Sequence, residues 1–287
     1  MLRLLARRAA AFALVVLTSS VVFGALLWSA PGASDRIAQD SLLGWIGAFW
    51  VGVFTGDLGT SYRGLPVDEM LWRGALRSLP LIGAALVASL GSGLALALAF
   101  GQRIGRLGRL LRGALHAVSL CPVFLLGYLA LVLVGIPPEG PRQTFFAVLI
   151  LAVGDGMLSD VLLGIETELT RLRESDFIQS ARLRGAPLLP HYAPHLALPL
   201  ARLGAARLAW LVGGVLVLEM VFGIQGIGLI GYKAAAASPP DVSLLVAITV
   251  FVTALVAGAG LGVDLLRALI DPRVRKDRRA IERQEAA

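Results

Sequence analysis

The charged residues of this chain are confined to short stretches between apolar runs of about twenty residues. A helix of about 20 residues covers the ~30 Å hydrocarbon core of a bilayer and satisfies its own backbone hydrogen bonds, which lipid cannot do. Only 16% of the residues are charged, against about 25% in soluble domains. The sequence therefore predicts an all-α polytopic membrane protein with about six transmembrane helices. The expected spans are residues 9–30, 78–101, 113–136, 144–164, 200–222 and 243–266.

The first apolar run follows Arg3, Arg7 and Arg8 and begins like a secretory signal. It is longer than the 7–15 apolar residues of a typical signal core. We therefore expect a retained first span, with cleavage near Ala30 as the alternative.

The basic residues predict the orientation, because cytoplasmic connections carry an excess of Lys and Arg. Residues 102–112 hold four arginines and no acid, whereas residues 31–77 balance four arginines against five acids. An N-in, C-in topology follows, with a single permease domain over residues 1–275 and a charged cytoplasmic tail over 276–287. This distribution explains the net charge of +7 by topology, so no nucleic-acid partner is expected.

Several chemistries are excluded by residue counts. The single cysteine, Cys121, permits no intrachain disulfide. The two lysines, Lys233 and Lys276, lie outside any GK[ST] context, so no Walker-type ATP site is expected. The chain is predicted to be no enzyme, with no catalytic residue, metal site or cofactor of its own.

The polar segment 165–199 interrupts the apolar pattern. Helical periodicity predicts a helix from Ile165 to Arg184, ended by Gly185, which tolerates positive φ. Pro187 suits the first turn of a short second helix. The later prolines are expected to prevent one long helix, with re-entry into the membrane near Pro199.

Two interpretations of this segment remain open from the residues alone. It is either a loop stiffened by prolines or a rigid surface for another protein. In the second case Ala186, Leu188, Leu189 and Tyr192 are presented to the partner, because apolar residues held outside a bilayer favour docking.

The stretch DFIQSARLRGAPLLPHYAPH resembles the cytoplasmic EAA loop of ATP-binding-cassette importer permeases, most closely the dipeptide/oligopeptide and nickel branch. Asp176, Ala181, Arg182, Gly185 and His195 fall on that pattern. GDLGTSYRGLPVDEML, EMVFGIQGIGLIGYKA and ALIDPRVR resemble further elements of the branch in the same order. The resemblance covers nearly the whole chain, although the loop has more prolines and fewer charges than the family pattern.

The resemblance implies a multi-pass subunit of the bacterial inner membrane that conducts short peptides. Its implied partners are a second homologous permease, two ATPase subunits that bind ATP and Mg, an extracytoplasmic substrate-binding protein and the lipid bilayer. The loop 174–196 would contain a coupling helix that docks on the ATPase. The implied docking residues are Ala181, Arg182, Arg184, Gly185, Ala186, Pro187, Leu188, Leu189 and Tyr192.

Other functions compete with peptide import. Nickel or another small solute is the alternative within the branch. An ion-coupled secondary transporter also needs many spans, but such transporters typically contain internal repeats, and none is evident here. A membrane scaffold that recruits a partner through the loop is the third hypothesis.

Acids within the apolar runs are candidates for the substrate path, because intramembrane charges are costly. Asp155 is expected in the middle of the fourth span, where it lines the cavity for a cationic group or makes a helix–helix hydrogen bond. Glu219 is placed near the outer end of the fifth span, where a structural or gating contact competes with substrate binding. Asp264 and Arg267 are expected to form an i,i+3 ion pair.

Overall fold

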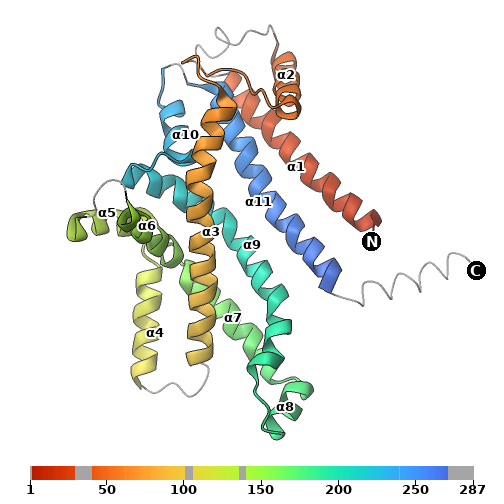
Figure 1. The fold of residues 1–287 in the computed structure, drawn as a ribbon, viewed down its shortest axis with the longest axis vertical. Coiled ribbons are helices and arrows are strands. Elements are labelled where there is room, and N and C mark those ends of the chain that lie inside the picture. Colours follow the sequence, from red (N-terminus) through yellow and green to blue (C-terminus); the bar gives the residue numbers. More distant parts are fainter. Residues whose placement is uncertain are drawn as a thin grey trace, which may run out of the picture. The chain divides into compact units, whose positions relative to one another are not determined.

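The computed structural model describes residues 2–29, 41–61, 63–100, 106–135, 140–238 and 240–270. This part of the chain forms helices and no strand, apart from an isolated bridge between Thr60 and Pro66 (Figure 1). The all-α prediction is therefore confirmed, while the predicted tail 276–287 lies outside the described residues. The helices are α1 (Leu2–Trp28), α2 (Leu42–Thr55), α3 (Val67–Phe100), α4 (Arg106–Ser119), α5 (Val123–Val134), α6 (Pro141–Val153), α7 (Met157–Arg173), α8 (Asp176–Leu183), α9 (Leu189–Phe222), α10 (Ile227–Ala235) and α11 (Val242–Ile270).

Four helices are long and apolar enough to cross a membrane, and two bent pairs bring the number to as many as six. The continuous candidates lie within α1, α3, α9 and α11. The expected third span is bent by 97° between α4 and α5, and the expected fourth span is bent by 51° between α6 and α7. Apolar composition thus located the spans but gave no sign that two of them are broken.

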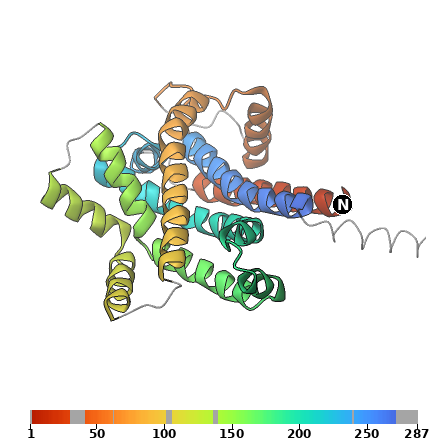
Figure 2. The same cartoon turned by 60° about the horizontal axis from the view of Figure 1, so that its bottom comes forward.

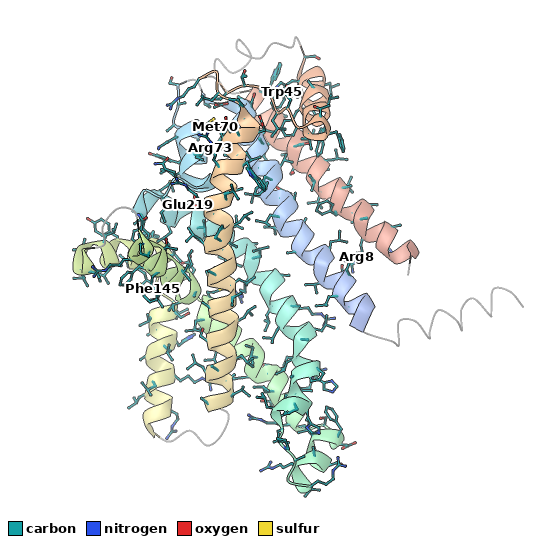
Figure 3. All side chains as sticks on the ribbon, viewed as in Figure 1. Arg8, Trp45, Met70, Arg73, Phe145 and Glu219 are labelled. Carbon is teal, nitrogen blue, oxygen red and sulfur yellow. The ribbon has the colours of Figure 1, made fainter. Side chains whose placement is uncertain are left out.

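The chain divides into two compact units, residues 1–75 with 230–287 and residues 76–229. In the first unit α1 and α11 lie side by side (Figures 1 and 2). Arg8 of α1, labelled in Figure 3, pairs with Asp264 of α11 at 3.3 Å. The prediction that Asp264 pairs with Arg267 was wrong, because the neighbouring helix brings a closer guanidinium.

Helix α2 lies in a region that the sequence analysis treated as a connection. Its 14 residues cover about 21 Å, which is too short to span the hydrocarbon core. Trp45 and Phe49 are buried, and the Trp50 indole donates to Ser20 Oγ of α1 at 3.0 Å. The helix therefore packs against α1 through its aromatic face.

Asp241 caps the N-terminus of α11 and ties a preceding loop to it. The carboxylate is 3% exposed, and its Oδ1 accepts from the Leu244 N–H at 3.3 Å. Its Oδ2 accepts from the hydroxyl of Ser61, which is also buried. One side chain thus satisfies a helix-end donor and a buried hydroxyl.

We expect Asp241→Ala to lower the free energy of unfolding by about 2 kcal/mol, since it removes a helix cap and leaves the Ser61 hydroxyl unpaired. Asp241→Asn is the matched control, because Asn is an equally good cap and keeps an acceptor for Ser61. Thermal unfolding in detergent measures both variants. Equal destabilisation by Ala and Asn would contradict this role.

The second unit is organised around α9, which contacts α5, α6 and α7. One face of α9 is buried, including Leu211, Val215 and Leu218. Close packing depends on glycines of the neighbouring helices. A methyl group at Gly164 of α7 would come within 2.7 Å of a Leu203 methyl, so this small residue allows the two helices to approach.

Candidate functional site

The segment predicted to couple the chain to an ATPase forms a compact structure at one end of α7 and α9 (Figure 1). We call residues 174–196 the knob. The expected continuous helix from Ile165 to Arg184 is wrong, because α7 ends at Arg173 and α8 begins at Asp176. The break has a local cause: Ser175 is extended, and its hydroxyl donates back to the Leu172 carbonyl.

The turn predicted at Gly185 is confirmed, with φ of +69°. The Ala186 N–H donates to the Ala181 carbonyl, and the Gly185 N–H donates to the Arg182 carbonyl, both at 3.0 Å. These two bonds form a Schellman motif, which satisfies the last carbonyls of a helix when the residue after the cap is left-handed. The Arg184 guanidinium donates to the Ser180 carbonyl at 3.1 Å, so three carbonyls at the end of α8 are bonded.

The prediction that the later prolines prevent one long helix was wrong. Helix α9 runs without interruption from Leu189 to Phe222, with Pro194 and Pro199 inside it. Pro190 stands in the first turn, where a missing N–H costs nothing. The carbonyls left free by Pro194 and Pro199 belong to Pro190 and His195, both exposed, so solvent can satisfy them.

The predicted docking residues divide into an inner and an outer set. Ala181 is fully buried and Tyr192 is 5% exposed, so the expectation that Tyr192 is presented to a partner was wrong. Ile178 and Leu196, which the sequence analysis did not single out, are buried with them. These side chains support the knob from inside. The exposed docking residues are Arg182, Arg184, Gly185, Pro187 and Leu189, with Ala186 and Leu188 half-buried.

Two further side chains complete the knob. Leu183 is 89% exposed and stands beside the arginines at the end of α8. The Phe177 and His195 rings lie 4.8 Å apart and tie α8 to α9. Leu183 could have been noticed from the sequence as a large apolar residue between two arginines.

The two broken spans meet at their breaks, where Asp155 lies. The Asp155 N–H donates to the Cys121 carbonyl at 3.1 Å, and the Gly156 N–H donates to the Ser119 carbonyl at 2.6 Å. Asp155 Oδ1 in turn accepts from the N–H of Val123, the first residue of α5, at 3.0 Å. The backbone groups freed by each break are therefore satisfied by the other break.

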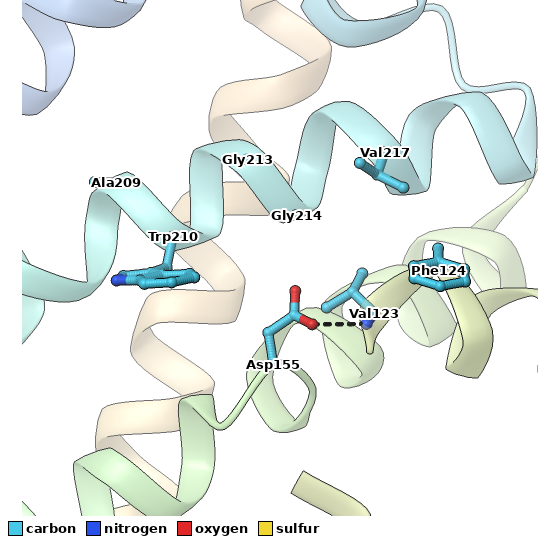
Figure 4. Close-up of a pocket in the computed structure, with 8 residues that line it drawn as sticks. All are labelled: Val123, Phe124, Asp155, Ala209, Trp210, Gly213, Gly214 and Val217. Atoms are coloured by element: carbon cyan, nitrogen blue, oxygen red, sulfur yellow. Dashed lines mark hydrogen bonds between the residues drawn. The ribbon is translucent and has the colours of Figure 1, made fainter. Parts of the chain in front are cut away.

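Asp155 also lines a pocket of about 360 Å³ (Figure 4). Trp210 of α9 enters the same pocket from the opposite wall. The pocket is lined by Val123, Phe124, Asp155, Ala209, Trp210, Gly213, Gly214 and Val217. Asp155 thus makes a helix–helix hydrogen bond and also lines a cavity, the two roles that the sequence left open. Its place in a substrate path stays a prediction.

Several other charged groups of this unit are paired. Asp160 forms an ion pair with Arg207 of α9 at 2.7 Å, and Arg112 pairs with Glu166 of α7. The His116 Nδ1 lies 2.9 Å from the Ser159 hydroxyl. These contacts connect α4, α7 and α9, and Arg207 also lines a small cavity beside Asp155.

Glu219, which is labelled in Figure 3, lies near the end of α9 and is fully buried. Its Oε1 accepts from the Ser78 hydroxyl of α3, and its Oε2 accepts from the Gly228 N–H at 2.7 Å. Ser78 Oγ also accepts from the Ile227 N–H at 2.8 Å. The structure therefore places Glu219 in a packing contact that anchors the first turn of α10, and its assignment to the substrate path stays a prediction.

Residues 89–276 match the family model described as "Binding-protein-dependent transport system inner membrane component". This match covers more than half of the chain and includes the knob, Asp155 and Glu219. The chain therefore belongs to this family and is a multi-pass protein of the bacterial inner membrane.

Among curated proteins, the chain is similar to the oligopeptide transport system permease protein OppB of Mycobacterium tuberculosis H37Rv. The two are 39% identical over 104 residues, which are 35% of this chain and 31% of the relative. It is also similar to OppB of Escherichia coli K12, with 32% identity over 105 residues, 35% of this chain and 34% of the relative. The matched segment thus spans about a third of the length of these relatives.

Proposed function

We propose that the chain is the permease subunit of an ATP-binding-cassette importer and forms part of the translocation pathway for short peptides. The observation that carries the proposal is the knob, within the region that matches the family model. It combines exposed Leu183 and Leu189 with two arginines on a backbone fixed by buried side chains and the Gly185 turn. A surface of this kind fits a groove on a partner protein.

The knob is suited to transmit motion, because its connections to the membrane helices are stiff. α8 is attached to α7 by a short bonded break and to α9 by the Schellman turn. A displacement of the knob would therefore reach α9 as a rigid movement. A flexible connector would absorb the motion and bias the two states of the membrane part much less.

The remaining partners and the cargo belong to the same proposal. The chain would pair with a second permease and two ATPase subunits, which bind ATP and Mg, and receive substrate from an extracytoplasmic binding protein. The names of the OppB relatives support a peptide cargo. The N-in, C-in orientation, which the basic connections favour, would place the knob in the cytoplasm with the ATPase.

Purification in mild detergent followed by reconstitution tests this function. We expect a second permease and an ATPase to co-purify with the chain, and uptake by proteoliposomes to require ATP. Uptake driven by an ion gradient without ATP would instead identify a secondary transporter. Recovery of the chain without an ATPase under all nucleotide conditions would refute the proposal.

A further inference from the structure

The pocket between α5 and α9 contains an uncompensated negative charge. Within the described residues, the Asp155 carboxylate accepts one hydrogen bond, from the Val123 N–H, and has no cationic partner. Arg207 of α9 lines a small adjoining cavity with Asp155 and Trp210, but its guanidinium is paired with Asp160 at 2.7 Å. Asp155 is nevertheless exposed to the pocket. Its Oδ2 therefore remains available to a ligand.

The surroundings of Asp155 favour a cation. Apart from the carboxylate, the pocket walls are apolar side chains and glycines, and a carboxylate beside apolar walls is stabilised by an opposite charge. Trp210 lines the same pocket beside Asp155 (Figure 4), and the face of an indole attracts cations, most strongly where water is excluded. The two side chains thus offer complementary interactions to one positive group.

The backbone of Asp155 adopts an unfavourable conformation at this place. Its φ of +51° is the one positive value among the described residues that are not glycine. Such conformations are enriched at ligand sites, because the surrounding structure must over-determine them. Here the Cys121 carbonyl and the Val123 N–H hold the residue from both sides.

We propose that this pocket binds the protonated amino terminus of a short peptide, with the ammonium group between Asp155 Oδ2 and the Trp210 ring. Gly213 and Gly214 leave room for the adjoining backbone because α9 carries no side chain at these positions. The volume of about 360 Å³ lies within the range of small-molecule sites. This inference rests on the proposed transport of peptides and identifies the part of the cargo that the permease itself recognises.

Binding of tri-alanine to the purified membrane complex in nanodiscs tests the site without ATP or binding protein. The fluorescence difference between wild type and Trp210→Phe reports on Trp210 among the five tryptophans of the chain. We expect tri-alanine to bind about tenfold more tightly than N-acetyl-tri-alanine, which lacks the charge. Asp155→Asn should abolish this preference while its amide oxygen still accepts from Val123. Equal binding of both peptides by wild type, or an unchanged preference in Asp155→Asn, would overturn the inference.

A second variant fills the pocket without altering Asp155. An added Cβ at Gly213 meets no atom within 4 Å, and the same holds for Gly91 of α3. Gly213→Leu should therefore weaken tri-alanine binding about tenfold, since its side chain occupies the ligand's place, whereas Gly91→Leu should bind as wild type. Wild-type binding by Gly213→Leu would overturn the inference.

The inference and the proposed function can fail separately. ATP-dependent uptake of tri-alanine by wild-type proteoliposomes without an amino-terminal preference in the binding assay would refute the pocket and retain the importer. Absence of ATP-dependent uptake would refute the importer, while the binding assay would still report on the pocket.

Discussion

Gly185→Val should leave ATP hydrolysis by the assembled complex intact and reduce ATP-driven peptide uptake about tenfold. Gly185 has φ of +69°, a conformation that costs a residue with a Cβ roughly 1–2 kcal/mol, and β-branched residues are the least tolerant of it. The cheapest relief is to open the bond from the Ala186 N–H to the Ala181 carbonyl. The connection between α8 and α9 would then become flexible, and ATPase motion would no longer reach α9.

Gly185→Asn is the matched control for this prediction. Asn adopts the left-handed conformation more readily than other residues with side chains, so it should keep the Schellman turn and most of the uptake. ATPase rate and peptide uptake are measured on the same proteoliposomes, and their ratio reports coupling. If Val and Asn couple equally well, the Gly185 turn is not the rigid element of the knob.

The sequence predicted the Gly185 turn because its cause is local. The positive φ of Gly185 and the cations before it favour a helix end locally, and the resemblance to the EAA loop lies in the same residues. The division of the knob into inner and outer residues could not be predicted from the local sequence. Tyr192 is buried in the folded knob, where the Phe177 and His195 rings bring α8 and α9 together, and this burial depends on tertiary contacts rather than on any local signal at Tyr192.

The broken spans were missed for a related reason. A run of apolar residues is the same whether its helix is straight or bent, and Gly154 and Gly156 read equally well as packing glycines. The bends are stable because the two breaks exchange hydrogen bonds across more than thirty residues of sequence, as from Val123 to Asp155. Likewise, Pro194 and Pro199 remain within α9 because the carbonyls that they leave free belong to exposed residues. Both outcomes depend on tertiary surroundings that local rules do not contain.

Gly228→Ala should strongly destabilise the contact around Glu219. A methyl group at Gly228 would lie 2.9 Å from the Leu216 carbonyl carbon and closer still to other backbone atoms of Leu216. Backbone inside α9 cannot move aside, so α10 must shift and the 2.7 Å bond from the Gly228 N–H to Glu219 must lengthen.

Two costs and one gain decide the size of this effect. Overpacking costs about 3 kcal/mol, and leaving the buried Glu219 carboxylate with one donor fewer adds to that cost. Replacing glycine by alanine within a helix returns only about 1 kcal/mol, so the net effect is a loss of at least about 2 kcal/mol. Gly83→Ala in α3 is the control, because its added methyl group meets no atom within 4 Å and should leave stability unchanged or slightly raised. Thermal unfolding in detergent compares the two variants. A midpoint for Gly228→Ala at or above that of wild type would mean that α10 does not approach α9 as closely as the contact around Glu219 requires.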